Sequence, residues 1–381
     1  MTNDKMPVFA FGSRVRPSPY FEATLRWGAS AFTTYNHTCM PARYGDGRQE
    51  YVALTTAATL WDVAAERQVE ISGADAFAFA QYLTPRDLSS CAPGKCRYVL
   101  ITNAEGGVIN DPVLLRLEEN LIWLSAADSD LMLWCRGIAA GGGFDVVLRE
   151  PDVSPLQLQG PKAADVAAAM FGEWVRELAY FHLRRFDFEG APLVVSRTGW
   201  SGERGYEIYL CDGERGDWLW ERIMSAGKPF GICPAAPSAV RRIEGGLLSY
   251  GADINGKDTP MHLGLERLVH LDGDFDFIGK RALRAQKSIG RKLAGVVLDG
   301  SPFVAPLARW RNVLDIPGGA RVGKVRSAVY SPRLQKNIGI AMLDNPHNDI
   351  GAQLYAESIG GDDGRRLRVC QMPFVDNSAA G

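Results

Sequence analysis

One stretch of the sequence decides the fold: Ser196-Arg-Thr-Gly-Trp-Ser-Gly-Glu-Arg-Gly-Tyr-Glu-Ile-Tyr-Leu210. Its first residue ends an apolar, β-branched run, residues 192–196, which predicts a buried strand. Glycines at positions 199, 202 and 205 then indicate a loop that turns tightly or brings backbone close to a ligand. In the strand that follows, side chains alternate, so Glu207 and Tyr209 share one face. This pattern suits a flat heterocycle with N–H donors, but a plain hairpin with Glu207 in solvent has the same spacing.

The composition is that of a soluble globular protein. The chain has 381 residues, enough to bury a sizeable core and to form two or three domains. Hydrophobic residues make up 46% of the sequence and charged residues 23%. Lys and Arg number 42 against 44 Asp and Glu. This balance gives no electrostatic case for nucleic acid or an anionic membrane as a partner.

Seven cysteines are scattered along the sequence, and none belongs to a Cys-x-x-Cys pair. Their spacing predicts neither a zinc site nor a disulfide framework, so no metal is expected. The first residues contain no apolar signal-like segment, and no apolar run approaches the length of a membrane span. Together with reduced thiols, these features predict a cytoplasmic protein.

A second informative segment, residues 93–115, predicts two strands joined by the turn Asn103-Ala-Glu-Gly-Gly107. The second strand contains Asn110 and Asp111, followed by Pro112. Because an asparagine cannot titrate, any general acid or base role in this segment falls to Asp111. The same three residues can equally form nothing more than a turn.

Three segments resemble the aminomethyltransferase family, which includes the T-protein of glycine cleavage. Residues 196–210 are similar to that family's Arg-Thr-Gly-Tyr-Thr-Gly-Glu-Asp-Gly-Phe-Glu-Ile segment. Residues 93–115 resemble its Pro-Gly-x-x-x-Tyr … Gly-Gly-x-x-Asp-Asp-Leu pattern, and residues 234–251 resemble its Ala-Arg-Asp-x-Leu-Arg-Leu-Glu-Ala-Gly helix. The resemblance covers roughly residues 14 to 375, essentially the whole chain.

The resemblance implies an α+β fold class, an aminomethyltransferase-type folate-binding fold with mixed and antiparallel sheets and helices. It also implies a small C-terminal antiparallel β-barrel, and the short strands expected after residue 290 have the rhythm of one. We therefore expect a folate-binding region over residues 14–285, built from two intertwined α+β subdomains. A barrel domain is expected over residues 290–375.

The resemblance also implies roles for individual residues. In the family, the last Glu of the first segment holds the pterin of tetrahydrofolate, and that position is Glu207 here. An Asp of the second segment faces the reactive nitrogen, which makes Asp111 the catalytic candidate, although whether it or Asn110 faces that nitrogen is left open. The other folate-binding candidates are Tyr98, Arg197, Trp200 and Tyr209. The substrate-binding candidates are Tyr35, His37 and Trp200.

The sequence departs from the T-protein pattern at several positions. Asn110 and Pro112 replace an Asp and a Leu, and Trp200 replaces a Tyr. A family Arg that contacts the folate falls at Ser238. The nearby charged residues of that segment, Arg242 and Glu244, are expected to form a helix–helix ion pair rather than ligand contacts.

The Asn-Asp-Pro triplet and the missing Arg agree instead with the dimethylsulfoniopropionate demethylase branch of the family. Phrases such as Thr34-Tyr-Asn-His37, Glu66-Arg-Gln-Val69 and Leu247-Leu-Ser-Tyr-Gly251 also resemble that branch. This resemblance implies a methyltransferase that moves a methyl group from dimethylsulfoniopropionate to N5 of tetrahydrofolate. The products are 5-methyltetrahydrofolate and 3-(methylthio)propanoate, and tetrahydrofolate is a co-substrate.

The implied chemistry suits a chain without a predicted metal site. A sulfonium is already a good leaving group, so the protein's main task is to align the methyl group with the nitrogen. Aromatic faces attract the cationic sulfur at about 0.5–2 kcal/mol each. The expected partners are a small methyl donor and folate, with no nucleic acid and no membrane, and a homodimer stays open.

Three alternatives accompany this hypothesis. One is a related folate-dependent demethylase acting on a methylated amine or an aryl methyl ether. Another is an aminomethyltransferase. A third is a non-enzymatic folate-binding protein that assists iron–sulfur cluster assembly. That class carries a Lys-Gly-Cys-x-x-Gly-Gln-Glu signature, and the corresponding residues 276–280 here contain no Cys.

Overall fold

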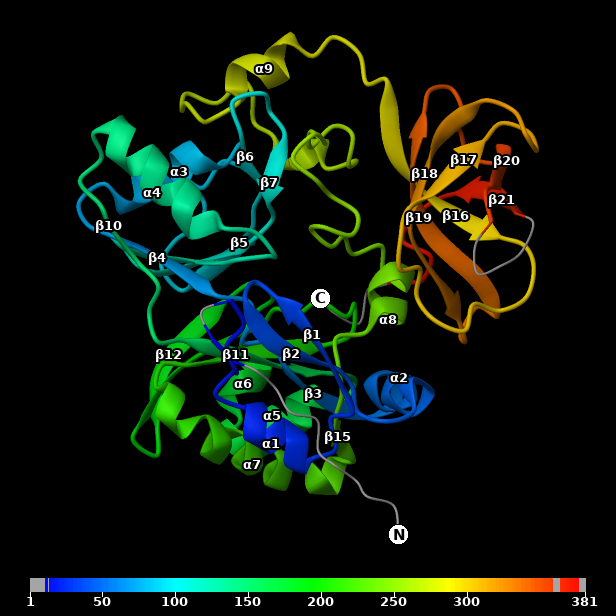
Figure 1. Cartoon of the computed structure of the whole chain (residues 1–381). Helices are drawn as coiled ribbons and strands as arrows, with labels where there is room; N and C mark the ends of the chain where they lie inside the picture. Colours follow the sequence, from blue (N-terminus) through cyan, green and yellow to red (C-terminus); the bar gives the residue numbers. More distant parts are fainter. Residues whose placement is uncertain (1–10, 13, 359–363, 377–381) are drawn as a thin grey trace.

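Two sheets and a barrel contain most of the strands (Figure 1). The structure is a computed structural model that describes residues 11–12, 14–358 and 364–376. The two sheets are formed by the first 234 residues, and the barrel begins at residue 291. The expected α+β fold class with a C-terminal antiparallel barrel is therefore confirmed.

The first sheet has six strands and contains both strands that flank the loop of residues 197–204. In order across the sheet they are β12 (Leu183–Phe188), β13 (Ala191–Ser196), β14 (Gly205–Leu210), β11 (Ser154–Gln159), β3 (Ala58–Asp62) and β15 (Ile232–Pro234). All neighbours are antiparallel except β15 and β3, which are parallel. Because β14 lies between β13 and β11 and both faces of the sheet are covered, all six of its residues are buried.

The two faces of β14 have different surroundings. Tyr206 and Ile208 pack into a core cluster with Trp220, under helices that cover the outer face of the sheet. These helices are α1 (Phe21–Arg26), α5 (Ala163–Phe171), α6 (Trp174–Glu177) and α7 (Gly216–Gly227). On the other face, the Tyr209 ring lies 6.2 Å from that of Trp123 in the second sheet. The predicted alternation is confirmed, and the face that carries Glu207 turns toward the second sheet instead of solvent.

The second sheet is antiparallel and has five strands. Their order is β10 (Val147–Arg149), β4 (Gln68–Ser72), β9 (Leu121–Ser125), β8 (Val113–Glu118) and β5 (Lys95–Tyr98). Two helices, α3 (Ala76–Leu83) and α4 (Leu131–Gly142), cover its outer face.

The predicted hairpin over residues 93–115 is present, but each of its arms is divided. The pair β5 and β8 belongs to the second sheet, whereas β6 (Ile101–Thr102) and β7 (Val108–Asn110) form a separate two-stranded sheet. Asp111 lies in the break between β7 and β8, where the backbone leaves one sheet for the other.

The loop before β14 requires glycine at its positions for different physical reasons. Gly202 adopts a φ of +68°, which favours glycine and allows the tight turn that the sequence predicts. At Gly199 and Gly205, an added methyl group would overlap the amide of Gln159, the residue opposite Gly205 in the β11–β14 register. Ser201 Oγ donates to Gln159 Oε1 at 2.6 Å and holds that amide in place. The close approach predicted for a ligand is thus made by a protein side chain.

The C-terminal barrel is closed and antiparallel. Its strands are β16 (Arg291–Leu298), β17 (Arg311–Leu314), β18 (Arg321–Ser331), β19 (Lys336–Asp344), β20 (Gln353–Ala356) and β21 (Arg365–Cys370). Alternate residues such as Val296, Ala341, Leu343 and Val369 fill its interior.

The remaining elements are short. They are β1 (Ala31–Tyr35), β2 (Thr38–Arg43), α2 (Gly47–Thr56), η1 (Gly213–Arg215), η2 (Lys228–Phe230), α8 (Ala239–Glu244), η3 (Glu266–Leu268) and α9 (Lys280–Ala285). Of these, α8, η3 and α9 are the ones that lead from the sheets to the barrel. Residues 245–265 form an irregular segment after α8, between the hairpin of β6 and β7 and the barrel (Figure 1). Within the residues that the structure describes, no helix is long and apolar enough to span a membrane.

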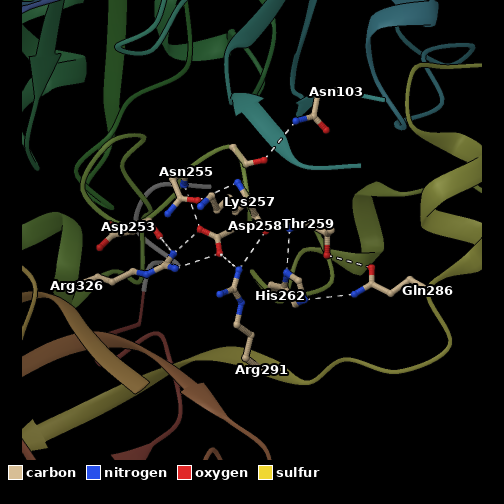
Figure 2. A network of polar contacts seen from close by, with 11 residues as sticks. Asn103, Asp253, Asn255, Lys257, Asp258, Thr259, His262, Gln286, Arg291 and Arg326 are labelled. Carbon is tan, nitrogen blue, oxygen red and sulfur yellow. Dashed lines mark hydrogen bonds and ion pairs between the residues drawn. The ribbon is translucent and has the colours of Figure 1, made fainter. Parts of the chain in front are cut away.

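A network of ion pairs fixes this irregular segment to the barrel (Figure 2). The Asp258 side chain is completely buried and receives Arg326 Nη1 at 2.6 Å and Arg291 Nη2 at 3.1 Å. The Asp258 carbonyl accepts the backbone N–H of Val108 at 2.8 Å, so the network also holds strand β7. The strand that leads to Asp111 is therefore positioned partly by the barrel.

Asp253 is a second buried acid of this segment. Its contacts show that the predicted ion pair of Arg242 and Glu244 is wrong. Arg242 does not pair with Glu244, because Arg242 Nη1 lies 2.5 Å from Asp253 Oδ2. Glu244 instead accepts hydrogen bonds from Tyr51 OH and Ser331 Oγ. The ion pair therefore joins α8 to the irregular segment.

Candidate active site

Glu207 is buried, with 3% of its surface exposed, and it is held by three donors. Thr198 Oγ1 and Tyr209 OH each donate to Glu207 Oε2 at 2.6 Å. Gln157, directly opposite in the β11–β14 register, donates from Nε2 to Glu207 Oε1 at 2.9 Å. A carboxylate accepts about four hydrogen bonds, so one acceptor position remains for a ligand. Burial raises the pKa of Glu207, and the three donors offset part of that effect.

A second carboxyl group, Glu66, lies beside Glu207. Gln157 Nε2 lies between them, 2.9 Å from Glu207 Oε1 and 3.4 Å from Glu66 Oε1. The other oxygen of Glu66 receives Ser125 Oγ at 3.5 Å, the upper limit for a hydrogen bond. Burial, and then the negative charge of Glu207, raise the pKa of Glu66 well above its usual range. The two acids together therefore hold a proton more readily than two separate carboxyl groups would.

Asp111 is the third acid, and one of its oxygens is unsatisfied. Tyr98 OH donates to Asp111 Oδ2 at 3.0 Å, whereas Asp111 Oδ1 is buried without a hydrogen-bond partner in the described chain. Burial raises the pKa of Asp111 to about 7, and the charge of Asp253 adds to this shift. A carboxyl group that titrates near neutrality is suited to proton transfer at that pH.

The neighbouring Asn110 has no such capacity. Its Nδ2 donates to the Ala127 carbonyl at 3.0 Å and to Ser129 Oγ at 2.8 Å, and its Oδ1 accepts the Ala127 N–H at 3.1 Å. All three bonds tie β7 to the segment before α4. The geometry thus favours Asp111 over Asn110 as the residue that faces a ligand.

Glu207, Glu66 and Asp111 form what we call the acid row. The order follows from their electrostatic effects, because both Glu207 and Asp111 raise the pKa of Glu66. Among the described residues, none of the three forms an ion pair with Lys, Arg or His. The row is therefore a source of negative potential without a protein counter-ion.

Two tyrosines lie along the acid row. Burial raises the pKa of the Tyr35 hydroxyl well above its usual range, and the charges of Asp111 and Glu66 add to this effect. Tyr98 bonds Asp111 directly, and its pKa is raised by burial and by that carboxyl group. Both predicted rings are thus brought to the same acids.

Trp200 and Arg197 are only partly available to a ligand. Trp200 Nε1 donates to the Leu248 carbonyl at 3.0 Å, and the Arg242 guanidinium lies 5.6 Å from the Trp200 ring centre. Arg197 is buried, and its Nη1 donates to the Leu178 carbonyl at 3.5 Å. Its guanidinium also lies 6.0 Å from the ring of Tyr180. Arg197 therefore has protein contacts of its own, and one face of Trp200 already meets a cation.

His37 has more exposed surroundings than Glu207 and Arg197. It occupies the turn between β1 and β2 with a φ of +62°, and about half of its side chain is exposed. Its Nε2 lies 3.2 Å from Asp130 Oδ1, at the start of α4. A role for His37 in substrate binding stays a prediction.

Several polar residues of the site were not predicted from the sequence. Glu66, Ser125, Gln157 and Thr198 all contact the acid row or belong to it. A signal for Gln157 was present, because Leu156-Gln-Leu-Gln159 alternates polar with apolar residues in a fully buried strand. For Glu66 there was only its place in a phrase that resembles one branch of the family.

The site fits the pterin ring that the family resemblance implies. Besides Asp111 Oδ1, the buried oxygen Gln157 Oε1 has no partner in the described chain. Two acceptors without donors and a carboxylate with one free position suit a ligand that carries several N–H groups. The described residues contain no group of three His, Cys, Asp or Glu side chains arranged to hold a metal ion.

Comparisons with known proteins agree with this fold and site. The family model of the GCVT N-terminal domain matches residues 20–273, and that of the glycine cleavage T-protein C-terminal barrel domain matches residues 291–376. The crystal structure of glycine cleavage system aminomethyltransferase T from Bartonella henselae superposes with a TM-score of 0.84. It is 24% identical and the match covers 95% of this chain and 99% of that one, which supports the fold. The chain therefore belongs to the glycine cleavage T-protein (GCVT) family.

Two curated relatives show which activities occur among similar chains. Dimethylsulfoniopropionate demethylase DmdA of Ruegeria pomeroyi is 38% identical over 351 residues, 91% of this chain and 94% of that protein. An aminomethyltransferase of Bacillus subtilis is 31% identical over 354 residues, 90% of this chain and 95% of that protein. The family resemblance inferred from the sequence, with its similarity to the demethylase branch, is confirmed.

Proposed function

We propose that the protein transfers a methyl group from dimethylsulfoniopropionate to N5 of tetrahydrofolate. The observation that carries this proposal is the acid row, three carboxyl groups beside two tyrosine rings with no ion-paired cation in the described chain. Such a site attracts a cationic donor and a ligand with N–H groups. The greater similarity to DmdA than to the aminomethyltransferases supports a sulfonium as that cation.

The pterin would lie at the Glu207 end of the row. Glu207 Oε1 has room for one more donor, and Gln157 Oε1 lacks one. Hydrogen bonds to a charged acceptor contribute about 1.5–3 kcal/mol each, so these contacts fix the ring orientation. Tyr98, bonded to Asp111, and Tyr209, bonded to Glu207, would line the two ends of the ring.

Asp111 would act at the reacting nitrogen. During the transfer, the bond between sulfur and methyl breaks, the electron pair stays on sulfur, and a new bond forms from N5 to the methyl group. N5 then carries an extra proton, which Asp111 Oδ1 accepts, because this oxygen has no other hydrogen bond. The Tyr98 hydroxyl holds the other oxygen and so fixes the carboxylate plane.

The donor would lie near Tyr35, whose pKa responds to both Asp111 and Glu66. The sulfonium gains from the tyrosine face and from the uncompensated acids, whereas a neutral aryl ether gains little from either. The donor's own carboxylate needs a positive or N–H partner, for which we propose Arg197 or a backbone N–H. The face of the Trp200 ring that does not meet Arg242 would line the donor site beside Tyr35.

A methylated amine is the second candidate donor, because a protonated amine is also a cation that the acid row would attract. Mass spectrometry of the products separates the two candidates. We expect 5-methyltetrahydrofolate and 3-(methylthio)propanoate when tetrahydrofolate and dimethylsulfoniopropionate are supplied. If a secondary amine or a phenol forms from the corresponding methylated donor, and dimethylsulfoniopropionate is not consumed, the sulfonium substrate is wrong. The reaction uses only small molecules, and we further propose that it takes place in the cytoplasm.

A further inference from the structure

We propose that Glu66 is a second ligand-binding carboxyl group, which accepts an N–H hydrogen bond from the pterin ring beside Glu207. The identity of the ligand rests on the proposed function, whereas the site itself rests on the contacts of Glu66. This assignment divides recognition of the N–H edge between Glu207 on strand β14 and Glu66 in the turn between β3 and β4.

The acceptor capacity of the two acids differs. Glu207 already receives Thr198, Tyr209 and Gln157 at 2.6–2.9 Å, which leaves it one free position. From the part of the chain that the structure describes, the Glu66 carboxyl group receives two long contacts, of 3.4 and 3.5 Å. Most of the unused acceptor capacity at this end of the row therefore belongs to Glu66.

Among the described residues, no cation forms an ion pair with Glu66. Its neighbour in sequence, Arg67, is turned away and donates from Nε to Glu150 at 2.7 Å. The groups that face Glu66 from other elements are Glu207, Asp111 and Tyr35, together with the neutral amide of Gln157 and hydroxyl of Ser125. The Glu66 carboxyl group is partly exposed, so a ligand donor that reaches it takes the place of solvent.

The backbone at Glu66 is held in place independently of its side chain. Gln68 Nε2 donates to the Glu66 carbonyl at 2.6 Å and to Ser125 Oγ at 2.9 Å. The Glu66 N–H donates to the Val63 carbonyl at 2.8 Å. Because the turn does not depend on the carboxyl group, a change of that group tests binding and not folding.

Proton balance gives a second signature. Burial and the charge of Glu207 raise the pKa of Glu66 in the free protein. A pterin N–H group that donates to Glu66 favours its ionised form and lowers that pKa. Binding of tetrahydrofolate should therefore be linked to release of a proton from Glu66.

The test is calorimetric titration of tetrahydrofolate into the wild type and the Glu66→Gln variant, in two buffers of different ionisation enthalpy. We expect the Kd of Glu66→Gln to rise at least tenfold and its proton release to disappear. Asp62→Asn is the matched control. Asp62 is a buried acid without a cation, its pKa is raised to about 6, and it lies on the opposite face of the first sheet. Its loss should leave Kd within about threefold.

The outcomes are distinguishable. If Glu207→Gln weakens binding and Glu66→Gln does not, Glu66 is a bystander and this inference is wrong. If the wild type does not bind tetrahydrofolate at all, the proposed function is wrong instead. If Glu66→Gln folds poorly, Glu66→Asp replaces it. That variant keeps a titratable group, so weaker binding with proton release retained supports the inference, and unchanged affinity overturns it.

Discussion

Two sets of acids lie close together in this molecule and have opposite surroundings. Asp253 and Asp258 are completely buried, and each is paired with an arginine, Arg242 and Arg326 respectively. The acid row has no such partner, although Asp253 still raises the pKa of Asp111. Paired acids fix one backbone arrangement, whereas acids without an ion-pair partner leave negative charge that a ligand can neutralise. The first set is structural and the second marks the site.

The largest expected effect comes from breaking the paired set. Arg326→Met removes both guanidinium contacts to Asp258 and should lower the free energy of unfolding by about 3–5 kcal/mol, because a buried charge loses its main partner. Urea denaturation measures this effect. Arg291→Met is the control, since that side chain is 36% exposed and should cost about 1 kcal/mol or less. Equal stability of the two variants would contradict the structural role of the pair.

Asp111→Asn tests the unpaired set. We expect kcat/KM to fall on the order of 100-fold or more, because Asn cannot accept a proton from N5. Arg326→Met is expected to lower the free energy of unfolding, whereas Asp111→Asn should keep or raise it. The folded-state pKa of Asp111, about 7, lies above its value in an unfolded chain. The wild type therefore loses stability as the pH rises through 7, and the variant does not.

At pH 8, the melting temperature of Asp111→Asn should thus equal or exceed that of the wild type. At pH 4, where the carboxyl group is protonated in the folded protein, the two should be similar. A large loss of stability at pH 8 would make Asp111 a turn residue, like its neighbour Asn110, and remove it from the reaction.

Glu207→Gln should weaken binding of tetrahydrofolate by about 2–3 kcal/mol, roughly 30–150-fold. Calorimetry measures the affinity, and circular dichroism checks that the fold is retained. A small decrease in melting temperature should accompany the change, because the Gln amide cannot accept from Thr198, Tyr209 and Gln157 at once. Unchanged affinity would exclude Glu207 from the pterin site.

The pH profile should show a smaller effect of the same acid. With Asp111 as the proton acceptor, kcat/KM should fall about tenfold for each pH unit below about 7 and stay level above it. Above neutrality a sulfonium needs no acid, since it leaves as a neutral thioether. A rate that falls as the pH rises above 7 would indicate a leaving group that needs a proton, as in an aryl ether demethylase.

His37→Ala should have the smallest effect. The side chain is half exposed and its contact in the described chain is Asp130, so we expect at most a threefold increase in KM for the methyl donor. A tenfold increase in KM would place His37 in the substrate site, as the sequence predicts. The site would then reach the turn between β1 and β2.

Local patterns of the sequence predicted the parts of the site that depend on local rules. Alternation along residues 206–210 placed Glu207 and Tyr209 on one face. Because Asn cannot titrate, the sequence limited an acid or base role to Asp111, but it left open which of Asn110 and Asp111 faces the ligand. The pairing of Glu66 with Glu207 could not be predicted, because the two lie on different elements and meet only through the Gln157 amide. Likewise, Arg242 pairs with Asp253 and not with Glu244, because residues two apart on helix α8 point to different faces of the helix.

In the fold, too, features set by local sequence could be predicted and features set by contacts between distant segments could not. Strands and their turns were legible from residue type, and the barrel from its series of short strands. The split of the hairpin at Asp111 was not legible, because it depends on how the Asp258 carbonyl holds Val108 from a distant segment. Non-local contacts of this kind decide where a strand leaves one sheet for another.

The amide of Gln159, enclosed by Gly199 and Gly205, also restricts how this loop can evolve. A side chain at either glycine would need the space that the Gln159 amide occupies, so Gln159 would have to leave its hydrogen bond with Ser201. The choice of residue at positions 199 and 205 is therefore linked to the residue at position 159, although that residue is far from both in the sequence.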